Sequence, residues 1–278
     1  MRNPKPKYAL MKKRIFLWIK IAIIIYCLIG IGLYYFQDRF IFQPEELPAD
    51  YEFKFPFPHK EINLPYTENS NINIVQFSPE DTDTVKGVVL YFHGNGQNIE
   101  RYSAHVPFFT KNNYAVWMID YPGYGKSTGE LSEKMLYEWA LIFYKLARAS
   151  FPAEKIILYG RSLGTGIAAQ LASIRDCKAL VLEAPFYSLP SLAGAKTLVY
   201  PVKNIIKYKF PTYEYLPQII APIIIFHGTD DSLIPISQGK RLAKLLTQKD
   251  KFIPVEGAGH NNVMNFPDYK NALDSLLR

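Results

Sequence analysis

The sequence predicts an α/β fold in which a mostly parallel central sheet is flanked by helices and preceded by a transmembrane helix. Three observations support this prediction. Short, continuous apolar segments alternate with helical stretches along most of the chain. One of these apolar segments runs through a Gly-x-Ser-x-Gly motif directly into a helical stretch. A further apolar segment near the N-terminus is long enough to cross a bilayer.

The net charge of +7 arises from the N-terminal residues of the 278-residue chain. Residues 1–20 hold seven Lys or Arg and no acid, and the rest of the chain balances 25 Lys or Arg against 25 Asp or Glu. The excess charge is therefore a terminal cluster and not a basic groove, which argues against a nucleic-acid partner.

Residues 15–36 are the predicted membrane anchor. As a helix they span about 33 Å, close to the roughly 30 Å of a hydrocarbon core. Their one charge, Lys20, lies near the cationic end, where its side chain can reach the headgroups. A buried core helix is disfavoured because the segment has no polar face. A cleaved signal peptide is disfavoured because no small-residue cleavage site follows the apolar run.

The cations before the anchor predict its orientation. Residues 1–14 form a cationic N-terminus that should stay in the cytoplasm, whereas Asp38 and Arg39 after the anchor roughly cancel. The bulk of the protein then lies on the extracytoplasmic side of the membrane. The sequence contains no Asn-x-Ser/Thr glycosylation sequon, which favours a bacterial periplasm.

Residues 37–60, rich in proline and aromatics, are interpreted as a linker that packs onto a domain formed by residues 61–278. In that domain an alternating segment and several continuous apolar runs predict strands. The predicted strands are Ile72–Phe77, Gly87–His93, Tyr114–Asp120, Lys155–Gly160, Ala179–Pro185, Pro222–Gly228 and Lys251–Val255. Helical stretches such as Ser132–Ala149 and Gly239–Leu246 lie between them, and this alternation predicts the parallel sheet.

Ser162 lies at the point where a predicted central strand ends and a helix begins. Catalytic groups of open α/β sheets gather at this carboxyl edge. Gly160 and Gly164 permit a sharp turn and close packing of the helix, as in a nucleophile elbow. An ordinary strand-to-helix turn with an accidental motif is the alternative.

A serine nucleophile requires a base, which in turn requires an orienting carboxylate. Chain order in such a fold places the acid and then the histidine after the serine. His260, in a Gly-rich loop after a predicted strand, is the candidate base, and His227 is interpreted as structural. Three residues are candidates for the carboxylate that orients the histidine, and each follows a predicted strand: Asp230, Asp231 and Glu183.

The same chemistry requires amide donors for an oxyanion. The backbone N–H of Leu163, directly after the serine, is one candidate. The loop of residues 93–96, which follows the strand Gly87–His93, is expected to supply the other.

Across residues 61–278 the chain resembles the α/β-hydrolase superfamily through the motifs "YFHGNGQN", "DYPGYGKSTG", "GRSLGTG", "LEAPF", "HGTDDSLIP" and "GAGHNN". Within it, the chain is most similar to the membrane-anchored serine hydrolases called α/β-hydrolase domain-containing proteins and to their bacterial relatives. The resemblance implies the α/β-hydrolase fold, with Ser162 as nucleophile, Asp231 as acid and His260 as base. It also implies an oxyanion hole formed by the backbone amides of Asn95 and Leu163. No metal cluster or nucleotide-binding fingerprint is present in the sequence, and this chemistry needs no cofactor.

We therefore expect a serine hydrolase that cleaves acyl ester or thioester bonds through an acyl-enzyme. A peptidase or amidase using the same triad is the alternative enzyme, and a non-catalytic, membrane-tethered binding domain is the alternative from another class.

Residues 186–220 belong to no predicted strand and are expected to form a short cap insertion. Aromatic and aliphatic residues alternate there with Lys196, Lys203, Lys207 and Lys209. One interpretation is a small apolar cap packed on the core. The other is a lid that turns apolar residues towards an acyl chain and lysines towards anionic headgroups, which predicts an acyl ester or lipid-like substrate.

Overall fold

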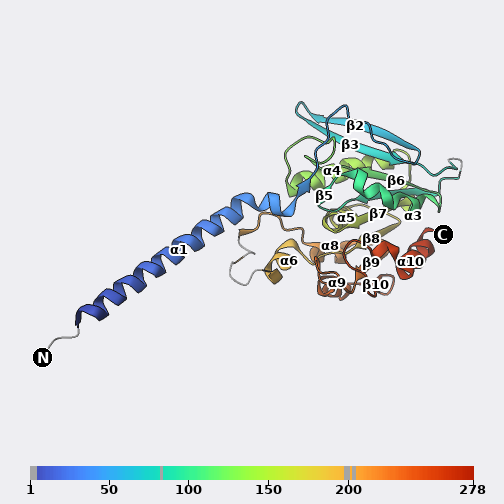
Figure 1. The fold of residues 1–278 in the computed structure, drawn as a ribbon. Helices are drawn as coiled ribbons and strands as arrows, with labels where there is room; N and C mark the ends of the chain where they lie inside the picture. The colour runs from blue at the N-terminus through green and yellow to red at the C-terminus, as the bar shows by residue number, and fades with distance from the viewer. Residues whose placement is uncertain (1–4, 82–83, 197–200, 202–204) are drawn as a thin grey trace.

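A mostly parallel sheet forms the centre of the domain (Figure 1), in a computed structural model that describes residues 5–81, 84–196, 201 and 205–278. Within these residues the sheet has eight strands in the order β10-β9-β8-β7-β4-β6-β3-β2. The β2–β3 and β3–β6 pairs are antiparallel and the others are parallel. The strands are β2 (His59–Thr67), β3 (Ser70–Phe77), β4 (Gly87–Phe92), β6 (Tyr114–Ile119), β7 (Ile156–Arg161), β8 (Ala179–Glu183), β9 (Ile223–Gly228) and β10 (Lys251–Val255).

Helices cover both faces of this sheet and bury a separate apolar core on each. One core lies under α4 (Glu133–Arg148), α5 (Leu163–Ile174), α8 (Thr212–Tyr215) and α9 (Ile236–Ala243). The other lies under α2 (Ile99–Tyr102), α3 (Val106–Thr110) and α10 (Pro267–Leu277). The predicted fold class, a mostly parallel sheet flanked by helices, is confirmed. Strands β4, β6, β7, β8 and β9 read as continuous apolar runs because both of their faces are buried.

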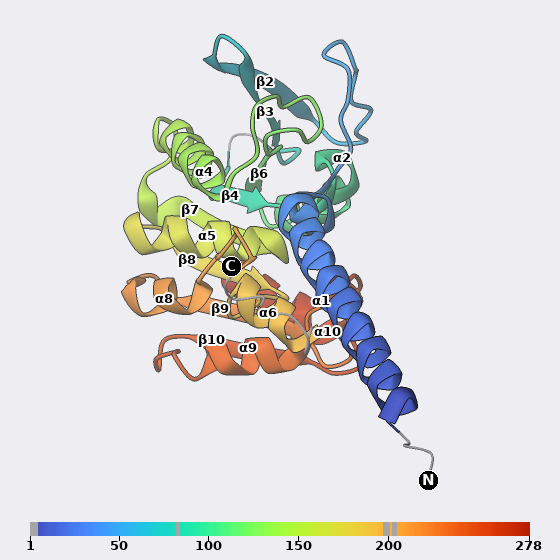
Figure 2. The ribbon, with the colours of Figure 1, turned by 90° about the vertical axis from the view of Figure 1, so that its left-hand side faces the viewer.

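Helix α1 (Lys5–Ile41) projects away from the domain (Figures 1 and 2). Its segment Leu10–Ile41 has a mean hydropathy of 2.4, and none of its most apolar stretch is buried in the protein, so it is long and apolar enough to cross a membrane. The helix continues past Phe36, where the predicted anchor ends, because its last turn packs on the domain. Residues 1–4 of the predicted cytoplasmic N-terminus lie outside the described residues.

The segment after α1 is joined to the loop that follows β4. The short strand β1 (Gln43–Pro44) pairs in parallel with β5 (Gly96–Gln97), which belongs to that loop. Further along, Phe53 is buried and stacks on Phe55, which packs edge-on against Phe77 of β3. The segment interpreted as a linker is thus packed on the domain along much of its length.

Between β8 and β9 the chain forms α6 (Leu189–Lys196) and then α8, in the region of the predicted cap insertion (Figure 2). Tyr208 and Phe210 of this region are buried in the core, as in the packed-cap interpretation. Tyr200 and Lys203 lie outside the described residues.

Candidate active site

Ser162 occupies a tight turn between β7 and α5. Its backbone has φ of 50° and ψ of −115°, a conformation that residues with side chains rarely adopt. The turn is held on both sides, since the Ser162 amide donates to the Glu183 carbonyl (2.9 Å) and the Ser162 carbonyl accepts from the Thr165 amide (3.0 Å). The hydroxyl is thereby presented at the carboxyl edge of the sheet.

Gly160 and Gly164 allow β7, β4 and α5 to approach closely around this turn. A Cβ on Gly160 would lie 2.5 Å from the Gly164 carbonyl oxygen, and a Cβ on Gly164 would lie 2.1 Å from the Phe92 carbonyl oxygen. Both distances are far below van der Waals contact with backbone atoms, so the two glycines of the motif are required by the packing of the turn.

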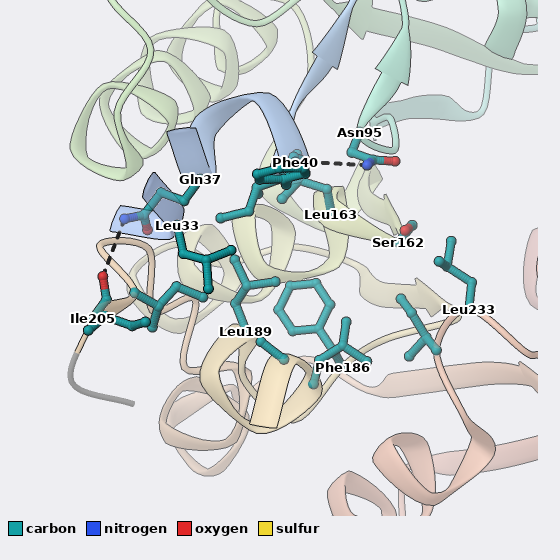
Figure 3. Close-up of a pocket in the computed structure, with 15 residues that line it drawn as sticks. Leu33, Gln37, Phe40, Asn95, Ser162, Leu163, Phe186, Leu189, Ile205 and Leu233 are labelled. Carbon is teal, nitrogen blue, oxygen red and sulfur yellow. Dashed lines mark hydrogen bonds between the residues drawn. The ribbon is translucent and has the colours of Figure 1, made fainter. Parts of the chain in front are cut away.

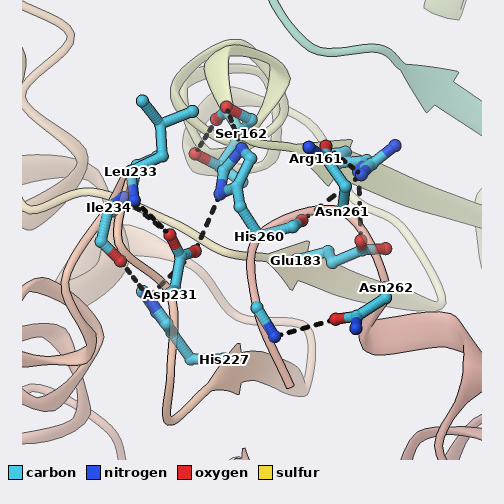
Figure 4. A network of polar contacts seen from close by, with 12 residues as sticks. Arg161, Ser162, Glu183, His227, Asp231, Leu233, Ile234, His260, Asn261 and Asn262 are labelled. Atoms are coloured by element: carbon cyan, nitrogen blue, oxygen red, sulfur yellow. Dashed lines mark hydrogen bonds and ion pairs between the residues drawn. The ribbon is translucent and has the colours of Figure 1, made fainter. Parts of the chain in front are cut away.

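His260 lies between Ser162 and Asp231 (Figure 4). Its Nε2 atom is 3.2 Å from the Ser162 hydroxyl oxygen, and its Nδ1 atom is 2.7 Å from Oδ2 of Asp231. Asp231 follows β9 and His260 follows β10, so three residues far apart in the sequence meet at one edge of the sheet. The structure therefore brings the predicted nucleophile, acid and base together.

The three candidate acids differ in their surroundings. Asp231 is buried, and its Oδ1 atom accepts hydrogen bonds from the backbone amides of Leu233 (2.9 Å) and Ile234 (2.7 Å). Burial opposes ionisation of Asp231, but the hydrogen bond from His260 and the Ile234 amide outweigh it and lower the pKa of the carboxyl group. Asp230 is exposed, and the Glu183 carboxylate pairs with Arg161.

His227 lies beneath Asp231 and is fully buried. Its Nε2 atom is 2.8 Å from the Ile234 carbonyl oxygen and 3.8 Å from the Asp231 carboxylate. Burial lowers the pKa of His227, so the ring is neutral and donates Nε2–H to Ile234. This position fits the interpretation of His227 as structural, because it supports the turn that carries Asp231.

The two residues expected to form the oxyanion hole line the same cavity as Ser162. Leu163 is the first residue of α5, so its amide has no acceptor within the helix. Asn95 is fixed at its carbonyl, which accepts from the Gln43 amide (2.9 Å) and the Tyr124 hydroxyl (2.8 Å). Its side chain donates to the Ile41 carbonyl at the end of α1 (3.1 Å).

Arg161 contributes to the site in a way that the sequence analysis missed. The buried guanidinium lies 3.1 Å from the Glu183 carboxylate and donates to the His260 carbonyl (3.3 Å) and the Asn261 side chain (3.1 Å; Figure 4). Burial works against the charge of Arg161, but Glu183 holds its pKa above the ordinary value. The available signal was an arginine and a glutamate at the ends of two apolar strands, which become register partners in the sheet.

A cavity of about 390 Å³ opens from Ser162 (Figure 3). It is walled by the end of α1, the loop after β4, the turn at the start of α5, α6 together with Ile205 and Ile206, and the loop after β9. Its lining residues are Leu33, Gln37, Phe40, Ile41, Asn95, Ser162, Leu163, Phe186, Leu189, Leu192, Ala193, Ile205, Ile206, Leu233 and Ile234. Apart from Gln37, Asn95 and Ser162 these residues are apolar, so the cavity suits an apolar substrate group.

Among the described residues, no three His, Cys, Asp or Glu side chains are grouped so that they could hold a metal ion.

Comparisons of the sequence with known proteins find hydrolases. The family described as serine aminopeptidase, S33, matches residues 83–215. The α/β hydrolase domain-containing protein aho-3 of Caenorhabditis elegans is 35% identical over 68% of this chain and 57% of its own length. The α/β hydrolase domain-containing protein 17C of Xenopus tropicalis is 32% identical over 68% of this chain and 61% of its own length. The chain thus spans about three fifths of these relatives.

Solved structures share the fold at low sequence identity. An esterase from Pyrococcus furiosus superposes with a TM-score of 0.66 and 18% identity, over 85% of this chain and 97% of its own. An α/β hydrolase from Vibrio vulnificus gives a TM-score of 0.64 and 22% identity, over 78% of this chain and 81% of its own. A monoacylglycerol lipase from Paleococcus ferrophilus gives 0.57 and 19%, over 74% of this chain and 98% of its own.

Proposed function

This chain belongs to the α/β-hydrolase superfamily, and from that premise we propose that it is a membrane-anchored serine hydrolase that cleaves acyl ester or thioester bonds. The observation that carries the proposal is the position of His260, whose two ring nitrogens lie 3.2 Å from the Ser162 hydroxyl and 2.7 Å from the Asp231 carboxylate. A serine hydroxyl becomes a nucleophile when such a base takes its proton.

In the acylation step, the Ser162 oxygen attacks the substrate carbonyl carbon and its proton passes to Nε2 of His260. Asp231 accepts Nδ1–H, which keeps Nε2 free to take the proton and stabilises the imidazolium. The backbone amides of Asn95 and Leu163 donate to the oxyanion of the tetrahedral intermediate. The C–O or C–S bond then breaks, and the leaving alcohol or thiol takes the proton from His260.

In the deacylation step, water attacks the acyl-serine carbonyl while His260 takes one water proton. Collapse of the second tetrahedral intermediate releases the carboxylic acid and returns the proton to the Ser162 oxygen. No cofactor enters either step.

A peptidase or aminopeptidase activity is the second candidate, since the matching family is described as serine aminopeptidase. An aminopeptidase binds the free α-amino group of its substrate, which calls for a carboxylate or several acceptors near the nucleophile. The described residues that line the cavity include no carboxylate, and apolar side chains predominate among them. This lining favours an acyl chain over an aminoacyl group.

Fluorophosphonate labelling and a substrate panel test the proposal. We expect the wild-type protein to be labelled and to hydrolyse acyl esters faster than aminoacyl amides, and Ser162→Ala to lose both labelling and hydrolysis. A protein that is neither labelled nor active would support the non-catalytic binding domain. Faster cleavage of aminoacyl amides would support the peptidase.

A further inference from the structure

The last turns of the membrane helix form one wall of the cavity at Ser162. Leu33, Gln37, Phe40 and Ile41 of α1 line it together with α6. In Figure 3, Leu33 lies at the opposite end of the cavity from Ser162. Leu33 and Ile41 are eight residues apart, which corresponds to about 12 Å along the helix. The cavity therefore runs along α1, from the catalytic edge of the sheet back towards the apolar length of the helix.

Hydrogen bonds fix this end of α1 on both sides of the cavity. On one side the Ile41 carbonyl accepts from the Asn95 side chain (3.1 Å). On the other side the Gln37 side chain donates to the Ile205 carbonyl (3.3 Å) and accepts from the Lys207 amide (2.7 Å). Because Gln37 is engaged with backbone groups, its contribution to the lining is largely its apolar stem. The helix is therefore a structural part of the cavity and not only a tether.

Lys207 and Lys209 of the cap insertion are also held in place. The Lys207 ammonium lies 3.9 Å from the Asp38 carboxylate and over the ring of Tyr34, and Lys209 donates to the Ile206 carbonyl. The contacts of Lys207 hold this part of the cap insertion against α1, so the far end of the cavity lies where the helix emerges from the domain.

We propose that α1 forms the wall of an acyl-chain site, and that the chain of a lipid in the surrounding bilayer enters this site along α1. The inference rests on the proposed function, because it places the scissile carbonyl at Ser162. The occupant follows from the apolar lining and from the continuity of that lining with a helix whose exposed side chains are apolar over residues 21–36. An acyl chain moving along this path exchanges lipid for protein contacts without crossing water.

Chain-length selectivity tests the wall. In the full-length protein in detergent micelles, kcat/KM is measured for butyryl and dodecanoyl esters of the same alcohol. We expect Leu33→Trp to lower the dodecanoyl-to-butyryl ratio by about tenfold or more, because the indole fills the far end of the site. Leu33→Ala is expected to move the preference towards longer chains.

Ile31 provides the matched control, since it lies two residues away on the same helix and is exposed on its surface. Ile31→Trp and Ile31→Ala are expected to keep the wild-type ratio. If the Leu33 and Ile31 variants give the same ratio as the wild type, α1 does not bound the acyl site and the inference is wrong.

Photocrosslinking tests the path without requiring hydrolysis. The full-length Ser162→Ala variant is placed in vesicles of phosphatidylcholine and phosphatidylglycerol that contain a trace of a lipid with a mid-chain diazirine. We expect adducts on Phe186, which is only 1% exposed and lines the cavity. Adducts confined to residues 15–32 of α1, which do not line the cavity and which any bilayer lipid reaches, would overturn the inference. A wild-type protein with no hydrolase activity would refute the proposed function and leave this crosslinking result to decide whether the site binds acyl chains.

Discussion

At the scale of single residues, Asp231 and Asp230 are adjacent carboxylates in different environments. Asp231 is buried and accepts from His260, whereas the Asp230 side chain is exposed on the same turn. We expect Asp231→Asn to lower kcat for a short-chain ester by roughly 10³- to 10⁴-fold, because the amide favours the wrong tautomer of His260. Asp230→Asn is the matched control and should stay within about threefold of the wild type. Equal losses in the two variants would remove Asp231 from its proposed role.

Buried His227 predicts how stability depends on pH. Burial lowers its pKa from the ordinary 6.5, so below that pH the unfolded chain binds a proton that the folded chain does not. His227 therefore has no destabilising effect above pH 6.5. As the pH falls from 6.5 towards the folded pKa, His227 lowers the free energy of unfolding by at most about 1.4 kcal/mol per pH unit. Asp231, whose folded pKa is also lowered, adds a loss at still lower pH.

The measurement is urea unfolding of the full-length protein in micelles at about pH 7.5 and about pH 5.5. The wild type should unfold at lower urea at the lower pH. His227→Gln should show a smaller difference between the two conditions, while buried His105, whose pKa is likewise lowered, still contributes. A variant that keeps the full difference would mean that another group is responsible.

At the scale of elements, the ends of β7 and β8 hold the loop that carries His260. The buried pair of Arg161 and Glu183 joins the strand ends, and Arg161 donates to the His260 carbonyl and to Asn261. Arg161→Leu leaves the buried Glu183 carboxylate with the Tyr159 hydroxyl but without its cationic partner, and should destabilise the fold by about 3–5 kcal/mol.

The double variant Arg161→Leu with Glu183→Leu separates packing from positioning. We expect it to recover most of the lost stability in urea unfolding, since no buried charge is left alone. It should nevertheless keep a lowered kcat, because the His260 loop lacks its arginine donor. Recovery of both stability and kcat would show that the pair acts on stability alone.

The elements differ in how far they could be predicted from the sequence. Strands β4, β6, β7, β8 and β9 were predicted within one or two residues because burial on both faces leaves continuous apolar runs. Strand β2 was not predicted, since its sequence "HKEINLPYT" is half exposed at the edge of the sheet and mixes polar with apolar residues. Helix α1 extends beyond the predicted anchor at both ends, because cations before residue 15 and Gln37 and Asp38 after residue 36 end the apolar run although the backbone stays helical.

The residues of the candidate site also differ in how far the sequence could predict them. Ser162 and His260 were named from a turn motif, chain order and their places after strands, which depend only on local sequence. The choice of Asp231 over Asp230 and Glu183 needed a family resemblance, because periodicity does not say which carboxylate points at His260. The role of α1 in the cavity could not be predicted, since a leucine facing lipid and one facing an acyl site look alike in the sequence.

At the scale of the whole molecule, the orientation of α1 decides which compartment Ser162 faces. The cations at the N-terminus predict that this end stays in the cytoplasm and that the domain lies on the other side of the membrane. We expect a reporter that is active only outside the cytoplasm to work when fused after Arg278. An active reporter that works only in the cytoplasm, fused at the same position, would reverse the orientation while leaving the lipid path along α1 unchanged.

The backbone of Ser162 implies a trade-off between activity and stability. Its φ of 50° and ψ of −115° cost a residue with a side chain about 1–3 kcal/mol. Glycine adopts these angles freely, because they mirror those of an ordinary extended residue, although it loses about 0.5–1 kcal/mol through the greater entropy of its unfolded chain. Ser162→Gly and Ser162→Ala both lack the hydroxyl, yet we expect the glycine variant to unfold at higher urea. The difference between their unfolding free energies would measure the stability that the protein loses by having a residue with a side chain, and hence a reactive hydroxyl, at this position. Equal values would mean that the neighbouring elements absorb the strain.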